Sequence, residues 1–120
     1  MAALLSCPAF AQEMKTGWKE LDAFHEMVPK LLHTAIAVDL QPLKQNSAKL
    51  LGAAKKWQNS KAPKGSDTPK YKTDLAELVK ECIDLDAAVK AEQPDAAIIA
   101  LADKAHKTFH LILAETVIQH

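Results

Sequence analysis

Residues 68–90 read TPKYKTDLAELVKECIDLDAAVK and carry the clearest structural pattern in the chain. Apolar side chains recur at alternating intervals of four and three, which is the period of an α-helix with one buried face. Thr68 followed by Pro69 is a strong helix start, because Pro is favoured at the first helical position. The stretch therefore predicts a helix from residue 69 onward. Its buried positions are expected to be Tyr71, Leu75, Leu78, Cys82, Leu85 and Val89.

The same period predicts three more helices, at about residues 17–37, 40–59 and 95–118. Pro29 lies inside the first of them and should kink or loosen it, because proline has no backbone N–H to donate. Residues 60–67 are polar and contain Pro and Gly, which indicates a solvated loop. The two other connections are short and favour antiparallel neighbours. We predict an all-α fold, an up-down-up-down antiparallel four-helix bundle over residues 12–120.

Composition narrows the class of protein. The chain has 120 residues, enough for one domain. Its 15 basic residues are all Lys, and 15 acidic residues bring the formal net charge to zero. Neutrality and the lack of Arg argue against nucleic-acid binding, since phosphate and guanine contacts favour Arg. Three Gly and 5% aromatic residues argue against an all-β fold.

The N-terminal segment MAALLSCPAFAQ is apolar, and Ala9-Phe10-Ala11 fits the small-x-small rule before a signal-peptidase cut. It is too short to span a bilayer and lacks the positive charges that begin a complete signal peptide. We interpret residues 1–11 as a signal-peptide remnant and expect a periplasmic or secreted protein without stable membrane insertion. Cleavage is favoured over a lipid-anchored form through Cys7. After cleavage only Cys82 remains, which excludes an internal disulfide.

Four of the five histidines form two pairs on the terminal helices, and His120 ends the chain. His25 and His33 lie on the first helix, where His25 takes an inward position. His106 and His110 lie on the last helix, one turn apart on one face, a spacing that suits a divalent metal. In an up-down bundle the first and last helices are neighbours. The sequence therefore predicts a metal site formed by these two pairs.

Two arrangements stay open. All four imidazoles could reach one ion, or His25 could pair with His110 and His33 with His106 at two levels. All-imidazole ligands suit Zn or Cu. Three acids near the histidines, Asp22, Glu26 and Asp103, are candidates for a further ligand or for orienting the rings. Cys82 lies on the seam of the third helix and is expected to be a buried hydrophobe rather than a ligand.

Residues 62–69, leading into the third helix, and a final helix with His110 near its end resemble periplasmic four-helix proteins of the cytochrome b562 and cytochrome c-prime type. In the b-type cytochromes a late His and an early Met ligate haem. The resemblance implies haem b held by His110 and, with His in place of Met, by His25. It leaves His33 and His106 without a role. No C-x-x-C-H is present, which excludes covalent haem attachment.

The sequence thus favours a small exported metal-binding protein that is not an enzyme. It would hold a Zn or Cu ion through His25, His33, His106 and His110, for storage, transport or sensing. The first alternative is a haem b electron-transfer protein that uses His25 and His110. The second is a structural or interaction bundle without a cofactor. The sequence leaves open whether the chain forms a homodimer.

Overall fold

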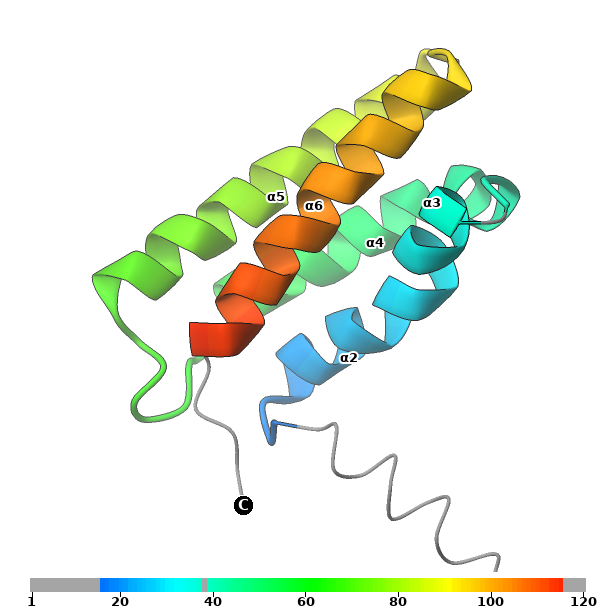
Figure 1. Ribbon diagram of the computed structural model, residues 1–120. Coiled ribbons are helices and arrows are strands. Elements are labelled where there is room, and N and C mark those ends of the chain that lie inside the picture. Colours follow the sequence, from blue (N-terminus) through cyan, green and yellow to red (C-terminus); the bar gives the residue numbers. More distant parts are fainter. Residues whose placement is uncertain (1–15, 38, 116–120) are drawn as a thin grey trace, which may run out of the picture.

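The computed structural model describes residues 16–37 and 39–115, and within these it contains helices and no strand (Figure 1). Four helical segments pack against one another, as the all-α prediction requires. The first segment has three parts. The elements are α2 (Lys19–Met27), η1 (Val28–His33), α3 (Thr34–Ala37), α4 (Gln41–Asn59), α5 (Pro69–Lys90) and α6 (Asp95–Glu115).

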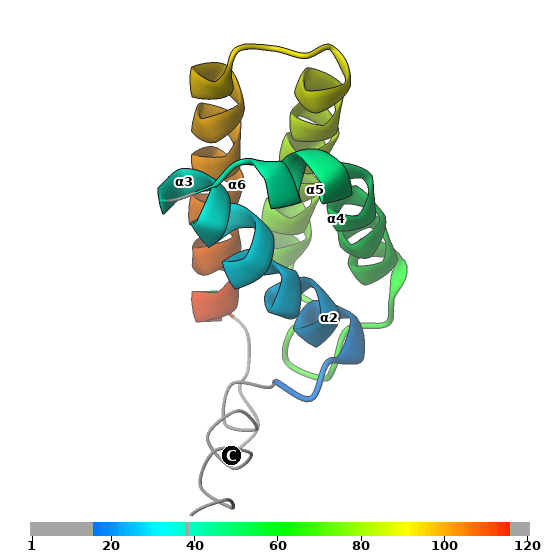
Figure 2. The same ribbon diagram turned by 90° about the vertical axis from the view of Figure 1, so that its right-hand side faces the viewer.

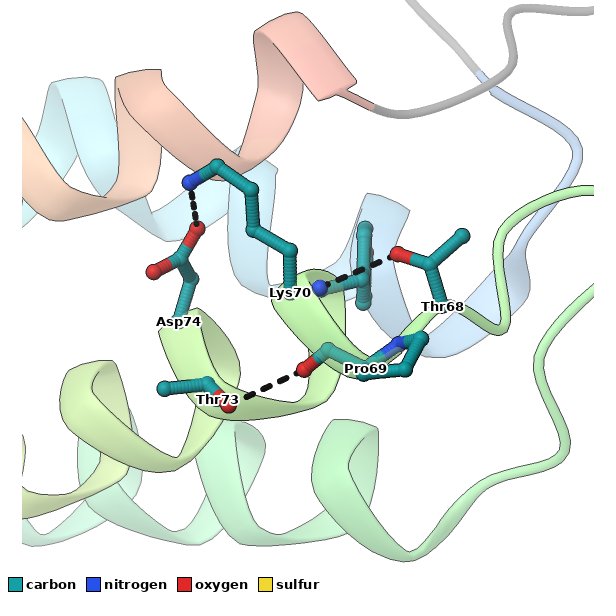
Figure 3. A network of polar contacts seen from close by, with 6 residues as sticks. Thr68, Pro69, Lys70, Thr73 and Asp74 are labelled. Atoms are coloured by element: carbon teal, nitrogen blue, oxygen red, sulfur yellow. Dashed lines mark hydrogen bonds and ion pairs between the residues drawn. The ribbon is translucent and has the colours of Figure 1, made fainter.

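Helix α5 begins where the sequence predicts. The Thr68 hydroxyl accepts a hydrogen bond from the backbone N–H of Tyr71 at 3.1 Å, and Pro69 opens the first turn (Figure 3). Such a cap stabilises a helix by about 1 kcal/mol. Lys70 and Asp74 form an ion pair of 2.9 Å one turn apart on the surface. An exposed pair of this kind adds only a few tenths of a kcal/mol, roughly.

The first segment loosens at Pro29, as predicted. Residues Val28–His33 form a π-helical turn, in which the backbone is wider than in an α-helix. Proline lacks the N–H that an α-helical ladder needs at this point. The Thr34 hydroxyl donates to the carbonyl oxygen of Pro29 at 2.9 Å, so a carbonyl in the wide turn keeps a partner. The chain therefore continues as one helical segment, but residues after Pro29 face a new direction.

The first segment approaches α6 through only part of its length. Helix α5 lies beside both α4 and α6, and α2 packs against α4. It is η1 and α3 that pack against α6, whereas no Cα atom of α2 comes within 8 Å of one in α6. Figures 1 and 2 show α3 beside α6 and α2 at the other end of the segment. The antiparallel up-down order of the helices stays a prediction.

One cluster of aromatic rings joins the segments in the core. Trp18 stacks on Tyr71 with ring centroids 5.4 Å apart and meets Trp57 edge-on at 6.1 Å. Phe24 contacts Trp57 at 5.5 Å and Phe109 at 5.3 Å. Each such pair adds about 0.5–1.5 kcal/mol beyond the burial of its area. These contacts tie the start of the first segment to α4, α5 and α6.

The structure corrects the expected inward face of the first segment. Phe24 is fully buried, whereas His25, which the period places inward, is only half-buried. Neighbouring helix positions point about 100° apart, and here the segment turns the Phe24 position, rather than the His25 position, fully into the core. Burying the apolar Phe ring is favourable, and burying an unpaired imidazole would cost about 1–3 kcal/mol.

Two acidic residues and one cysteine of α5 are buried. The Asp86 carboxylate accepts a hydrogen bond from the Ser47 hydroxyl at 2.7 Å and pairs with Lys90 at 2.8 Å. Glu81 accepts from the Thr108 hydroxyl at 3.0 Å. Burial raises the pKa of the Cys82 thiol to about 12, so this thiol is inert and acts as a hydrophobe, as predicted. In the described part of the chain, no helix combines the length and apolar character needed to cross a membrane.

Candidate metal centre

Three of the four predicted histidines come together on the surface. His33 Nε2 lies 2.6 Å from His106 Nε2, and His110 Nε2 lies 2.9 Å from the same atom. The ligand atoms of all three lie within 4.8 Å of one another. The rings of His33 and His110 are nearly parallel, at 13°, and the His106 ring stands almost perpendicular between them. We call these three residues the His33–His106–His110 group.

Two structural elements position this group. His106 and His110 are one turn apart on α6, so their rings point the same way from a single helix face. His33 is the last residue of η1, the part of the first segment that packs against α6. The wide turn at Pro29 sets the direction in which His33 leaves the backbone. Single π-turns inside helices occur often at functional sites.

The nitrogen atoms of the group cannot all form well-aligned hydrogen bonds with one another. A neutral imidazole nitrogen has either one N–H or one lone pair. His106 Nε2 faces two other Nε2 atoms, so it can form a good hydrogen bond with only one of them. The other contact can only share the same N–H or lone pair, which gives a weaker and poorly aligned hydrogen bond. A cation held by the three lone pairs would remove this conflict.

The electrostatic surroundings favour a neutral His106. His106 is half-buried, while His33 and His110 are exposed. Burial lowers the pKa of His106, and repulsion from His110 and His33 lowers it further. Asp103 acts weakly in the opposite direction. A neutral imidazole is the form that binds a metal, so the site has its central ligand ready at neutral pH.

His25 does not join the His33–His106–His110 group. Its ring lies against Phe109, with centroids 5.2 Å apart. Burial lowers the pKa of His25, partly offset by Asp22, and repulsion from His110 acts in the same direction as burial. His25 is thus near the group but packed on the aromatic core. The reason lies in the backbone, because no Cα atom of α2 comes within 8 Å of one in α6.

None of the three neighbouring acids contributes an oxygen to the group. Asp103 pairs with Lys107 at 3.0 Å. Asp22 accepts hydrogen bonds at 2.9 and 3.0 Å from the backbone N–H and the hydroxyl of Thr16. Among the side chains that the structure describes, in residues 16–37 and 39–114, no acid or cysteine belongs to the group. Glu26, the third candidate acid, is exposed and also lies outside it.

The haem alternative finds no support in the described residues. His110 turns its Nε2 toward His106, and His25 lies on Phe109. Phe24, Trp57 and Phe109 are fully buried and in mutual contact between the helices. A haem between His25 and His110 would have to displace part of this aromatic packing. His120 and the expected signal segment, residues 1–11, lie outside the described residues.

Comparisons of this chain with protein-family models, with curated proteins and with solved structures find no match. The resemblance to the cytochromes therefore stays a prediction from residues 62–69 and His110.

Proposed function

We propose that this protein binds one divalent transition-metal ion, Zn or Cu, through His33, His106 and His110. The observation that carries the proposal is the convergence of three imidazole nitrogens from two helical segments. The sequence pattern had suggested four ligands, and the geometry supports three of them. We propose a role in storing, carrying or sensing the ion, without enzymatic activity.

The spacing of the nitrogens fits such an ion. Zn–N bonds of about 2.0–2.1 Å at tetrahedral angles place ligand nitrogens roughly 3.3 Å apart. The two short separations, 2.6 and 2.9 Å, would open by less than about 1 Å. The third separation, between His33 and His110, is at most 4.8 Å and would adjust to about the same value. Rotation of exposed side chains can supply movements of this size without moving a helix.

The donor set limits the metal. Imidazole suits Zn, Cu and Ni, whereas Mg and Ca prefer oxygen ligands. The buried Cys82 lies on α5, away from the group, so it offers no thiolate. Both Zn and Cu fit the three nitrogens, and host metal content decides between them.

The test is metal analysis of the purified protein, followed by calorimetric titration with Zn and Cu. Wild type should bind one ion per chain. The double variant His106→Ala plus His110→Ala should lose this binding. His25→Ala is the matched control, because it removes a neighbouring imidazole but leaves the His33–His106–His110 group intact. Stoichiometric binding that survives in the double variant would overturn the proposal.

We also propose that the protein is exported, on the basis of the apolar segment that ends at Ala11. Mass spectrometry of the protein recovered from its own host tests this. A mature chain that begins at Gln12 supports export with cleavage. Recovery of intact Met1 in the cytoplasm argues against it.

A further inference from the structure

The His33–His106–His110 group lies at the surface of the protein. His33 and His110 are exposed, and His106 is half-buried against the helix. Three nitrogens fill three positions of a tetrahedral ion, and the fourth position needs another donor. In closed structural zinc sites the protein supplies all four ligands. The identity of the fourth donor therefore decides what kind of site this is.

No fourth histidine, cysteine or acid lies beside the three ligands among the side chains that the structure describes. The group contains three residues, and no further His, Cys, Asp or Glu joins it in residues 16–37 and 39–114, which are those with described side chains. The Asp103 carboxylate is paired with Lys107. His25 packs on Phe109 from α2, which stays more than 8 Å from α6 between Cα atoms. For His25 to reach the ion, it would have to leave the core ring on which it lies.

We propose that the bound ion keeps a fourth position that faces solvent and accepts a small oxygen- or nitrogen-donor ligand from outside the chain. This inference rests on the proposed metal site. Water fills the position at rest, and an incoming anion or imidazole replaces it by simple ligand exchange. No redox change or covalent bond to carbon is involved. An ion with one exchangeable ligand can be handed on, because the next donor binds before the histidines release it.

The test uses Co(II) as a coloured substitute for Zn and azide as the probe ligand. Four-coordinate Co(II) absorbs visible light, and its bands shift when a ligand is replaced. Wild-type protein loaded with one Co(II) should show a band shift that saturates as azide is added. His25→Ala should bind Co(II) as wild type does and show the same shift. His120→Ala, which alters a residue outside the described part, should also behave as wild type.

The outcomes separate the two proposals. Co(II) that binds at one per chain with bands insensitive to azide would overturn the open position and leave the metal site standing. A band change in His25→Ala or His120→Ala before azide is added would show that this histidine is the fourth ligand, and would overturn it too. Failure to bind Co(II), Zn or Cu at all would overturn the proposed function itself.

Discussion

His33 Nε2 and His106 Nε2 lie 2.6 Å apart, although 73 positions separate the two residues in the chain. Their meeting depends on the backbone as much as on the side chains. His33 ends the π-helical turn that begins beside Pro29, and this turn is the part of the first segment that rests on α6. The proline thus links a local irregularity to the candidate site.

Replacing Pro29 should weaken metal binding. Pro29→Ala restores a backbone N–H and allows α-helical geometry, which would turn His33 away from His106. We expect the affinity for Zn to fall at least about tenfold, or roughly 1.4 kcal/mol. Calorimetric titration measures this, and circular dichroism checks that helicity is kept. Pro42→Ala is the matched control, because Pro42 lies in the first turn of α4, where proline disturbs nothing. Unchanged affinity in Pro29→Ala would show that the turn does not position His33.

Metal binding should weaken in acid. A protonated imidazole has no lone pair for a metal ion, and the ordinary pKa of histidine is about 6.5. Zn affinity should therefore be steady above neutral pH and fall steeply below about 6. Titrations from pH 8 to pH 5 measure the slope. Affinity that stays constant down to pH 5 would point to carboxylate ligands in place of the three imidazoles.

How far the sequence predicts the structure differs between elements. The start of α5 is set by local chemistry at Thr68 and Pro69, and the sequence predicts it closely. The site is predicted in part. The spacing of His106 and His110 alone puts them on one face. The turn at Pro29 decides which histidine of the first segment joins them. Periodicity does not predict the direction of the chain after this turn.

His25 shows why the sequence alone does not predict the complete set of ligands. The periodic pattern places position 25 on the inward face and position 24 beside it. Packing decides between them, because the Phe24 ring fits between Trp57 and Phe109 and excludes His25 from the centre. Contacts between segments far apart in the chain, rather than any local signal, leave His25 on the outer side of Phe109.

The buried Asp86 carboxylate on α5 should make stability depend on acid. The hydrogen bond from Lys90, and then that from Ser47, hold the pKa of Asp86 below its ordinary value against the opposing effect of burial. A lowered folded-state pKa gives stability that is full above the unfolded value, about 3.9, and is lost as pH falls through the folded pKa. Asp86→Asn should cost about 1–3 kcal/mol at pH 7. Urea unfolding at pH 7 and pH 3 measures it. A cost as large at pH 3 as at pH 7 would contradict the account.

Glu81 should behave in the opposite way. Burial raises its pKa, so the folded state favours the protonated carboxyl. That contribution is full below the unfolded pKa, about 4.3, and is lost as pH rises through the folded value. Glu81→Gln keeps an oxygen for the Thr108 hydroxyl and removes the charge. We expect this variant to be more stable than wild type by about 1 kcal/mol at pH 7 and nearly equal to it at pH 4. Glu26→Gln, at an exposed position on α2, is the control. A loss of stability in Glu81→Gln at pH 7 would show that the buried charge is favourable.

Binding of one ion by His33, His106 and His110 is tested most directly by anomalous diffraction. The data are recorded from crystals of the Zn-loaded protein on both sides of the Zn absorption edge. We expect one strong anomalous peak at about 2.0–2.1 Å from the Nε2 atoms of His33, His106 and His110. No peak at this group in crystals that contain stoichiometric Zn, or a peak bound by other residues, would contradict it.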